Sequence, residues 1–436
     1  ELDKENIGTQ YWNPFKNLVK PGERVFIKPN MIAERHRYRS NEWDYVITHG
    51  SVIRPIIDYL FLAMEGKGEV IIGDAPQTDS NFYKVAQLMG LFEIREVYKS
   101  FKDFHISIIN LQDEHWIVKD DIITDYVRLS GDPLGGVLFD LGNKSFFSEL
   151  DNKNVTFYGA SYDLDETNRA HSKGHHKYWI AKSPIVADVF INIPKLKTHK
   201  KCGITINLKS LVGINANKNF LPHYIFGGPE EGGDQFDKYN IKSKIENKIV
   251  VPIKNQMSKK NPIAIFLSRK LKKFGYKVLG DTEEVIRSGN WYGNDTVWRM
   301  SLDLNKILMY GNSDGTFRSK YEERKRFFSI VDGIVAMEGN GPVAGERKEC
   351  GVLIAGFDPV AVDAVGAKIM GFNPNKLKII SKCFDDQELK LTNLSLEDIV
   401  CVSNDERFNK RLVDIKYQDS FKFRPHFGWI NHIEDF

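Results

Sequence analysis

Two adjacent runs of the chain gather residues that can bind an anion and move a proton. The first run carries Lys195, Lys197 and His199 at alternate positions, and the second carries Asn207 and Lys209. Alternate side chains of an extended strand point to the same side, so the first three residues are expected to form one face. Neighbouring ammonium groups repel one another unless an anion or a carboxylate lies opposite. The cluster therefore predicts a phosphate, a carboxylate or an acidic partner, with a solvated basic loop as the alternative.

Carboxylates at other strand ends supply the opposite charge. Asp74, Asp332 and Asp358 each follow a β-rich run closely. Carboxylate oxygens suit a hard divalent cation such as Mg²⁺, which binds phosphates in turn. The three aspartates therefore predict a metal site, with helix capping or ion pairing as the alternative.

The remaining candidates complete an acid/base and anion-binding set. An imidazole titrates near neutral pH, so His49 or His199 is expected as general acid or base, with Lys195 as the third catalytic residue. We expect these catalytic side chains to be held for chemistry rather than for packing. The expected anion-binding side chains are Lys28, Asn30, Lys197, Asn207, Lys209 and Arg299.

Arg299 lies in a pattern that has two interpretations. Asp295, Arg299 and Asp303 recur every four residues and so share one face of a predicted helix. This is the pattern of a salt-bridge ladder, but such an arginine can also clamp an anion through two parallel hydrogen bonds. Both interpretations stay open. His171, His175 and His176 have a spacing similar to that of metal ligands, yet we expect a surface loop there.

Five β-rich runs alternate with helical patterns, which predicts an α/β fold with a mostly parallel sheet and flanking helices. The runs are 24–27, 69–72, 188–193, 327–331 and 351–355. In open parallel sheets, ligands bind beyond the carboxyl ends of the strands. We therefore expect the polar residues that follow the five runs to share one crevice.

Two helices can be placed from their end signals. Residues 52–64 have apolar positions at helical spacing and stop at Gly66. Asp358 is expected to cap a second helix that has Pro359 at its first position and Gly371 as its stop.

The strand–helix alternation fails between residues 220 and 290. We predict a bilobed core of residues 1–219 and 291–436 and an inserted basic helical lid at 220–290. Within the insertion, the stretch 254–277 contains eight lysines and arginines and no acidic residue. Its apolar residues recur at helical spacing, which predicts an amphipathic basic helix. Such a helix can pack as a lid, lie on an anionic membrane surface or dock on an acidic partner.

Composition narrows the class of protein. A chain of 436 residues that is 42% hydrophobic can bury a sizeable core, and a formal net charge of +3 gives no field that argues for nucleic acid. The four cysteines are far apart and lack the Cys-x-x-Cys spacing of zinc or iron–sulfur sites. No apolar run approaches the roughly 20 residues of a membrane span. We expect a cytoplasmic protein, peripheral to a membrane if the basic stretch docks there.

The chain resembles the family catalogued as domain of unknown function 362. The matching segments are Val25–Asn30, Thr48-His49, Gly73-Asp74, Ala187–His199, Asn207–Gly213, Asn294–Arg299, Val331–Gly333, Glu338–Pro342 and Asp358–Asp363. The resemblance implies an α/β fold and a shared polar site, but no settled reaction. Some members carry a ferredoxin-like module with Cys-x-x-Cys spacings. This chain has no such spacing, so the resemblance brings no iron–sulfur cofactor with it.

Three hypotheses on function follow from these patterns. The first is an enzyme that acts on an anionic small molecule or glycan precursor, phosphorylated or carboxylated, with or without a divalent cation. The second is racemase-like proton abstraction beside a carboxylate, because the layout is also similar to that of nickel-pincer lactate racemases. The third is a non-enzymatic assembly protein. A buried site in which histidines and carboxylates converge favours an enzyme, and a flat basic face favours docking.

Overall fold

The computed structural model describes residues 2–119, 122–159, 163–238, 284–385 and 388–436, together with the single residues 248 and 263. Apart from residue 263, the basic stretch 254–277 lies outside these ranges. The predictions made for that stretch therefore remain predictions.

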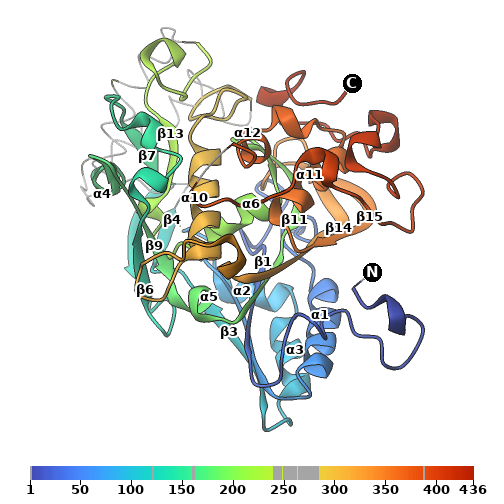
Figure 1. Ribbon diagram of the computed structural model, residues 1–436. Coiled ribbons are helices and arrows are strands. Elements are labelled where there is room, and N and C mark those ends of the chain that lie inside the picture. The colour runs from blue at the N-terminus through green and yellow to red at the C-terminus, as the bar shows by residue number, and fades with distance from the viewer. Residues whose placement is uncertain are drawn as a thin grey trace.

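In the described part of the chain, eight strands form one central sheet (Figure 1). The order across it is β12-β11-β14-β10-β1-β2-β3, and β15 pairs with β14. The five runs predicted from sequence correspond to β1, β2, β10, β14 and β15, so each is confirmed as a strand. The bounds are β1 (Arg24–Pro29), β2 (Gly68–Asp74), β3 (Phe104–Asn110), β10 (Val189–Ile193), β11 (Lys195–His199), β12 (Gly203–Thr205), β14 (Arg326–Glu338) and β15 (Glu346–Gly356).

Most neighbours in this sheet are parallel, as expected, but the fifth predicted run is not. β1, β2, β3, β10, β11 and β14 run in one direction, whereas β15 is antiparallel to β14, with Ser329 opposite Gly356. The short connection 339–345 joins β14 to β15 as a hairpin and leaves no room for a crossover helix. The carboxyl end of β15 therefore lies at the opposite edge of the sheet from those of the parallel strands.

Successive side chains of each strand point to opposite faces of the sheet, so the hydrophobic core has one part on each face. Val25 and Ile27 of β1 pack with the helices of one face, and Phe26 packs with those of the other. The first face carries α1 (Gly50–Ala63), α2 (Phe82–Leu88) and α3 (Leu91–Tyr98). The second face carries α6 (Asn207–Ser210), α10 (Val297–Tyr310) and α11 (Pro359–Met370). In Figure 1, α1 and α3 lie together at the lower end, and α10, α6 and α11 lie above them.

The predicted helix ends are confirmed. α1 ends at Ala63, and Gly66 follows with a positive φ of 66°. α11 begins at Pro359, and the Asp358 side chain accepts hydrogen bonds from the backbone N–H groups of Val360 and Ala361. Gly371 ends α11 in the left-handed conformation, which a glycine adopts without strain.

Smaller elements flank the central sheet. They are β4 (Glu114–Lys119), β5 (Ile122–Arg128), β6 (Gly136–Asp140), β7 (Phe157–Gly159), α4 (Leu164–Ala170), β8 (His171–Ser172), β9 (His175–Ala181), α5 (Lys182–Val186), β13 (Pro222–Ile225) and α12 (Lys378–Ser381). The prediction of a surface loop around His171 is wrong. β8 and β9 form a tight hairpin in which Lys173 and Gly174 take the left-handed conformation, and His171 and His176 are buried.

Over the described residues, no helix has the length and apolar character needed to cross a bilayer.

Candidate functional site

Five buried lysines lie at or beside the carboxyl ends of the central strands. This lysine cluster consists of Lys28 in β1, Lys195 and Lys197 in β11, Lys209 in α6 and Lys218 in a 3-10 turn. Burial, and then the charges of neighbouring lysines, lower the pKa of Lys197 well below its usual range. The pKa of Lys218 falls to about 7, mainly through burial. Burial and the nearby lysines therefore disfavour the charged form of these two amines.

Lys28 and Asp74 form a buried ion pair, with 2.9 Å between Nζ and Oδ1. The other carboxylate oxygen accepts a hydrogen bond from the Met31 backbone N–H at 2.9 Å. Gly213 packs directly on the pair, and a Cβ at this position would lie 1.7 Å from the Asp74 oxygen. Asp74 thus neutralises Lys28 within a tightly closed space.

Asn207 belongs to a polar network on the same face of the sheet. Its side-chain oxygen accepts hydrogen bonds from the amide of Asn192 and the hydroxyl of Ser329. The carboxylate of Asp363 accepts hydrogen bonds from the backbone N–H groups of Asn207 and Leu208. Burial raises the pKa of Asp363 to about 7. This network fixes the start of α6, and α6 in turn positions Lys209.

Lys195 and Asp332 form a second buried ion pair, 2.8 Å from Nζ to Oδ2. The same Asp332 oxygen accepts a hydrogen bond from the backbone N–H of His49 at 2.9 Å. The His49 side chain caps α1 by accepting from the Ser51 N–H, and its ring stacks on Trp43. Both the backbone N–H and the side chain of His49 therefore make hydrogen bonds at the start of α1.

Lys197 has no carboxylate partner among the described residues. Its ammonium donates to the backbone carbonyls of Val46 at 2.8 Å and Pro342 at 3.2 Å. The Asn30 side chain donates to the same Val46 carbonyl at 2.9 Å. Asn30 and Lys197 thus lie together at one carbonyl, and their predicted role in anion binding stays a prediction.

Lys209 stands apart from the other members of the cluster. Only 9% of its surface is exposed, and within the described ranges no hydrogen bond or ion pair holds its ammonium. Burial lowers its pKa, and the charge of Lys28 lowers it further. A buried charge without a partner costs several kcal/mol. An anion beside the ammonium, or loss of its proton, would remove this cost.

His199 lies at the end of β11 beside Lys209. Its Nδ1 accepts a hydrogen bond from the Lys201 backbone N–H at 3.0 Å. Burial is the largest cause that lowers the pKa of His199 well below its usual range, and the charges of Lys209 and Lys200 add to it. The ring is therefore neutral at pH 7.

The sequence analysis missed two residues of this region, His223 in β13 and Lys218. The Nδ1 of His223 lies 2.9 Å from the Leu221 carbonyl, and its ring is half-buried. Lys218 donates to the carbonyls of Ala75, Val212 and Asn215. A single histidine in an apolar run and a lysine in a loop carry no signal on their own, and only the fold brings them to the cluster.

Two predicted site residues lie elsewhere. Arg299 donates hydrogen bonds to Asp295, Glu149 and the Phe146 carbonyl. It is therefore held in a structural ion-pair network. The expected ladder is present between Asp295 and Arg299, but Asp303 does not take part, because it pairs with Ser145 and Tyr178. Asp358 follows β15 at the opposite edge of the sheet and caps α11.

The three aspartates do not form a metal site. Asp74 and Asp332 each face a lysine ammonium, and Asp358 lies at the other edge. Across the ranges that the structure describes, no group of three or more His, Cys, Asp or Glu side chains is placed to hold a metal ion. The prediction of a shared carboxylate site is therefore not supported by the placement of these residues.

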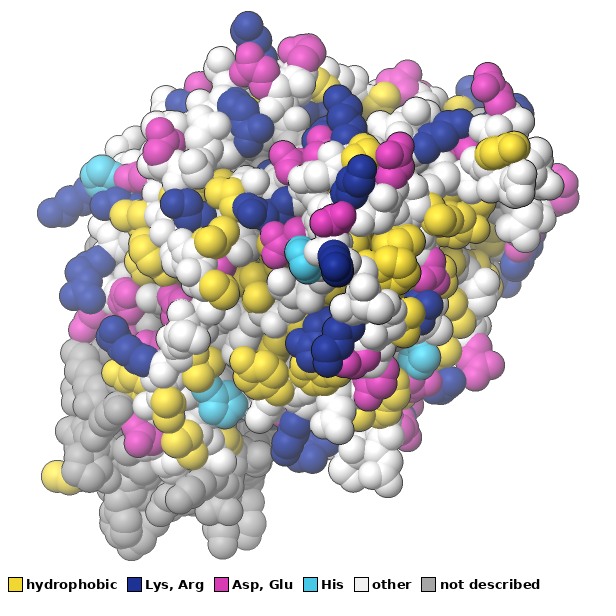
Figure 2. Space-filling view, turned by 90° about the horizontal axis from the view of Figure 1, so that it is seen from below, with side chains coloured by type: hydrophobic (Ala, Val, Ile, Leu, Met, Phe, Trp, Pro, Cys, Tyr) yellow, Lys and Arg dark blue, Asp and Glu magenta, His cyan; other side chains and the backbone are white. Residues whose placement is uncertain are grey.

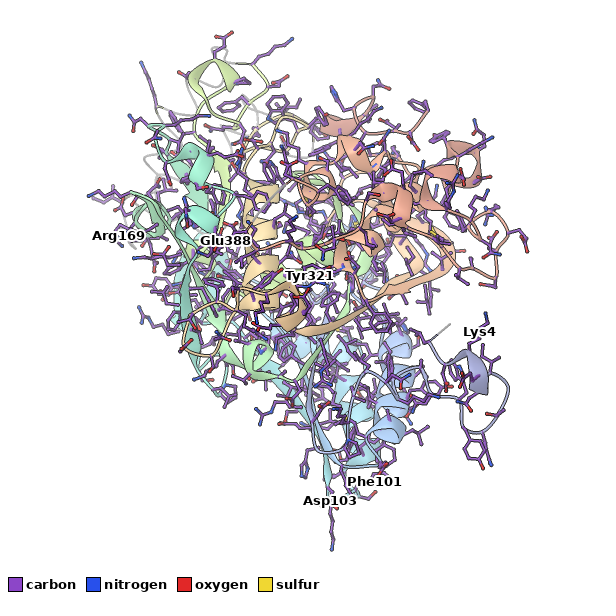
Figure 3. All side chains as sticks on the ribbon, in the orientation of Figure 1. Lys4, Phe101, Asp103, Arg169, Tyr321 and Glu388 are labelled. Atoms are coloured by element: carbon purple, nitrogen blue, oxygen red, sulfur yellow. The ribbon has the colours of Figure 1, made fainter. Side chains whose placement is uncertain are left out.

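Two surface hollows lie away from the lysine cluster. One, of about 560 Å³, is lined by residues that include Tyr321 and Lys325, near the amino end of β14. Another is lined by Phe61, Phe101 and Asp103, and Figure 3 shows Phe101 and Asp103 at the lower tip of the molecule. Neither borders the lysine cluster, so the cluster is a buried set rather than the wall of these hollows.

Comparison with known proteins assigns the family. The sequence model described as domain of unknown function (DUF362) matches residues 122–368, more than half of the chain. The chain belongs to this family. The match includes β10, β11, α6, β14 and β15, so four of the five lysines of the cluster lie within the family region.

Other similar proteins are more distant. The thylakoid-associated protein sll1697 from Synechocystis sp. is 22% identical over 358 residues, which cover 82% of this chain and 66% of the relative. A crystal structure of a Thermotoga maritima protein (9% identity, TM-score 0.30) covers 79% of this chain. The lactate racemase apoprotein from Thermoanaerobacterium thermosaccharolyticum (10% identity, TM-score 0.29) covers 82%. The chain spans 53% and 51% of these two structures, and both TM-scores are low.

Proposed function

We propose that the protein is an enzyme that binds an anionic small molecule, phosphorylated or carboxylated, at the lysine cluster. The observation that carries this proposal is the nearly buried Lys209 side chain, for whose ammonium the described residues provide no partner. Asp74 and Asp332 compensate two of the five lysines, and Lys197 and Lys218 rely on carbonyls. An anion near Lys209 would relieve the remaining repulsion.

The burial of the cluster supports an enzyme over a docking face. Lys28, Lys195 and Lys197 are each 1% exposed, and a macromolecular partner could not reach them without opening the fold. On the face seen in Figure 2, the basic and acidic side chains of the described residues are interspersed. A small anion that enters a buried polar site fits these observations better than an acidic protein does.

Binding of simple anions tests the proposal. Inorganic phosphate, pyruvate and dihydroxyacetone phosphate are titrated while the melting temperature is followed, because a ligand of the folded state alone stabilises it in proportion to ln(1 + [L]/Kd). At least one anion should raise the melting temperature of the unmodified protein and fail to do so in K209M. K102M, in which an exposed lysine is replaced, is the control. An equal response of K209M and the unmodified protein would contradict the proposal.

A second candidate concerns location. We propose that the stretch 254–277 docks on an anionic membrane surface. The stretch contains eight basic residues and no acidic residue. Each basic residue near anionic headgroups contributes about 1 kcal/mol to the free energy of membrane binding. The name of the Synechocystis relative describes that protein as thylakoid-associated. Both observations support the proposal.

A further inference from the structure

A surface hollow near the amino end of β14 borders an arginine that pairs with no carboxylate in the described part of the chain. The hollow has a volume of about 560 Å³, which is within the size range of small-molecule sites. Its lining comes from segments far apart in the sequence and includes Leu18, Tyr321, Arg324, Phe357 and Asn393. Tyr321 is labelled near the centre of Figure 3. The fold therefore assembles this hollow, at the opposite edge of the sheet from the lysine cluster.

Arg324 is held in a fixed position at the wall of the hollow. Its Cζ lies 3.4 Å from the ring centroid of Tyr321, so the guanidinium lies over the aromatic ring. Its Nε donates to the Tyr321 carbonyl at 3.2 Å, and its Nη1 donates to the Leu391 carbonyl at 2.7 Å. An anion that binds this guanidinium therefore does not have to order a flexible side chain.

The guanidinium also keeps free donors. Among the residues that the structure describes, no acceptor takes the Nη2 donors or the second N–H of Nη1. An arginine binds a carboxylate through two parallel hydrogen bonds of this kind. Arg326, which also borders the hollow, shows the contrast, because its two Nη atoms donate to Glu23 at 3.1 and 2.7 Å. Arg324 thus offers a carboxylate the donors that Arg326 already uses on Glu23.

The charges around the hollow favour a ligand with one negative charge. Arg324, Lys325 and Arg326 border it, and Lys325 donates to two backbone carbonyls, which satisfy its ammonium without cancelling its charge. The opposing carboxylates are the exposed Glu322 in the lining and the Glu23 partner of Arg326. One positive charge is left over. A single carboxylate matches this surplus, whereas a phosphate dianion exceeds it.

The rim of the hollow adds an aromatic surface. Phe357 borders the hollow with 55% of its surface exposed, and its ring packs on Phe328 with 4.9 Å between the centroids. The ring is therefore supported from one side although more than half of it contacts water. Burial of exposed apolar surface is favourable, and aromatic rings attract one another in offset and edge-on arrangements. An aromatic group on a ligand would cover Phe357.

We propose that this hollow is a second ligand site, which binds an aromatic carboxylate. Arg324 donates two hydrogen bonds to the carboxylate, and the ring of the ligand covers Phe357. The proposal is independent of the proposed function, because the lysine cluster lies at the carboxyl ends of the parallel strands and the hollow lies near their amino ends.

Titration of the full chain with three small probes tests the proposal. Phenylacetate carries a carboxylate and a ring, acetate carries the carboxylate alone, and 2-phenylethanol carries the ring without the charge. Dissociation constants are measured by ligand-observed NMR. We expect phenylacetate to bind at least about 10-fold more tightly than the other two, because each of these makes only one of the two contacts. If 2-phenylethanol or acetate binds as tightly as phenylacetate, the proposal is wrong.

Two variants remove the two contacts separately. R324M removes the donors and should weaken phenylacetate binding by at least about 10-fold while leaving 2-phenylethanol binding unchanged. A merely structural role of Arg324 would alter the melting temperature but not this preference. F357S removes the exposed ring, should leave the melting temperature unchanged and should weaken phenylacetate binding by about 5-fold. The matched control is R411M, which replaces an arginine that is 60% exposed and pairs with Asp414, and it should bind phenylacetate normally.

K209M separates this site from the lysine cluster. It should bind phenylacetate as tightly as the unmodified protein does, because Lys209 lies at the other edge of the sheet. Loss of phenylacetate binding in K209M together with normal binding in R324M would place the carboxylate at the lysine cluster and overturn the second site. Equal binding by R324M and R411M, or no detectable binding by the unmodified protein, would overturn it as well. These results leave the binding of phosphate or pyruvate at the lysine cluster to its own test.

Discussion

The Lys195 ammonium lies 2.8 Å from the Asp332 carboxylate, and both side chains are fully enclosed. The same carboxylate accepts the His49 N–H at the start of α1. The pair therefore joins β11, β14 and the first turn of α1. The expectation was that Lys195 is held for chemistry, whereas this placement favours a structural role for a pair that belongs to the lysine cluster.

Replacement of Lys195 should destabilise the fold. K195M leaves the Asp332 carboxylate buried without its cation, and breaking such a pair costs about 3–5 kcal/mol. Urea denaturation followed by tryptophan fluorescence measures the loss. The double variant K195M/D332L removes both charges and should recover most of the stability, because a buried pair can be replaced by apolar residues at little cost. A loss below about 1 kcal/mol in K195M would show that Lys195 is not structural.

Gly213→Ala should disturb the other buried pair. The added Cβ would lie 1.7 Å from Oδ1 of Asp74 and 2.8 Å from Nζ of Lys28. One of the two groups must move, and overpacking of this kind typically costs about 1–3 kcal/mol. We expect a lower melting temperature together with weaker binding of inorganic phosphate. An unchanged melting temperature would mean that the space around the pair is looser than the structure indicates.

His171 should make stability depend on pH in the acidic range. Burial lowers its pKa from 6.5 to about 3. Between these values the unfolded chain binds a proton that the folded chain does not, so stability falls as the pH falls, by about 1.4 kcal/mol per pH unit. H171F fits the aromatic surroundings of Phe147 and Tyr178 and should flatten the slope between pH 4.5 and 6.5. H105F, which alters an exposed histidine, is the control, and equal slopes in the two variants would contradict the assignment.

The basic stretch should bind anionic vesicles. The intact protein is expected to co-sediment with vesicles that contain anionic lipid at low salt and to be released at high salt, because salt screens the charge attraction. Reversal of Lys270, Lys272 and Lys273 to Glu should abolish co-sedimentation and leave the melting temperature unchanged. Protein that stays in the supernatant at low salt would rule out the membrane proposal.

Local signals in the sequence predicted the elements well. The β-rich run of β1, the cap at Asp358 and the stop at Gly371 depend on residues close together in the chain, so they can be recognised without the fold. The direction of β15 could not be recognised, because a buried strand has the same apolar pattern whether it runs parallel or antiparallel. The wrong position expected for Asp358 follows from that single ambiguity.

The pairing within the site was beyond the reach of the sequence. Lys195 and Asp332 are 137 positions apart, and the sequence does not reveal which of several carboxylates faces which lysine. The tautomer of His199 depends on the backbone N–H of Lys201, which any residue except proline would supply at that position. Residue types therefore predicted anion-binding and acid/base groups, whereas the hydrogen-bond partner of each ring nitrogen follows only from the three-dimensional arrangement.

The hydrogen bonds of Lys197 have a thermodynamic consequence. Its ammonium donates to the Val46 carbonyl before α1 and to the Pro342 carbonyl between β14 and β15. A ligand that takes a hydrogen bond from this ammonium competes with both carbonyls. Ligand affinity and the local opening of the two loops are then coupled, and the coupling is reciprocal. A substitution in the 339–345 connection that weakens the hydrogen bond from Lys197 to the Pro342 carbonyl would therefore increase the affinity for the ligand, although the substituted residue does not contact the ligand.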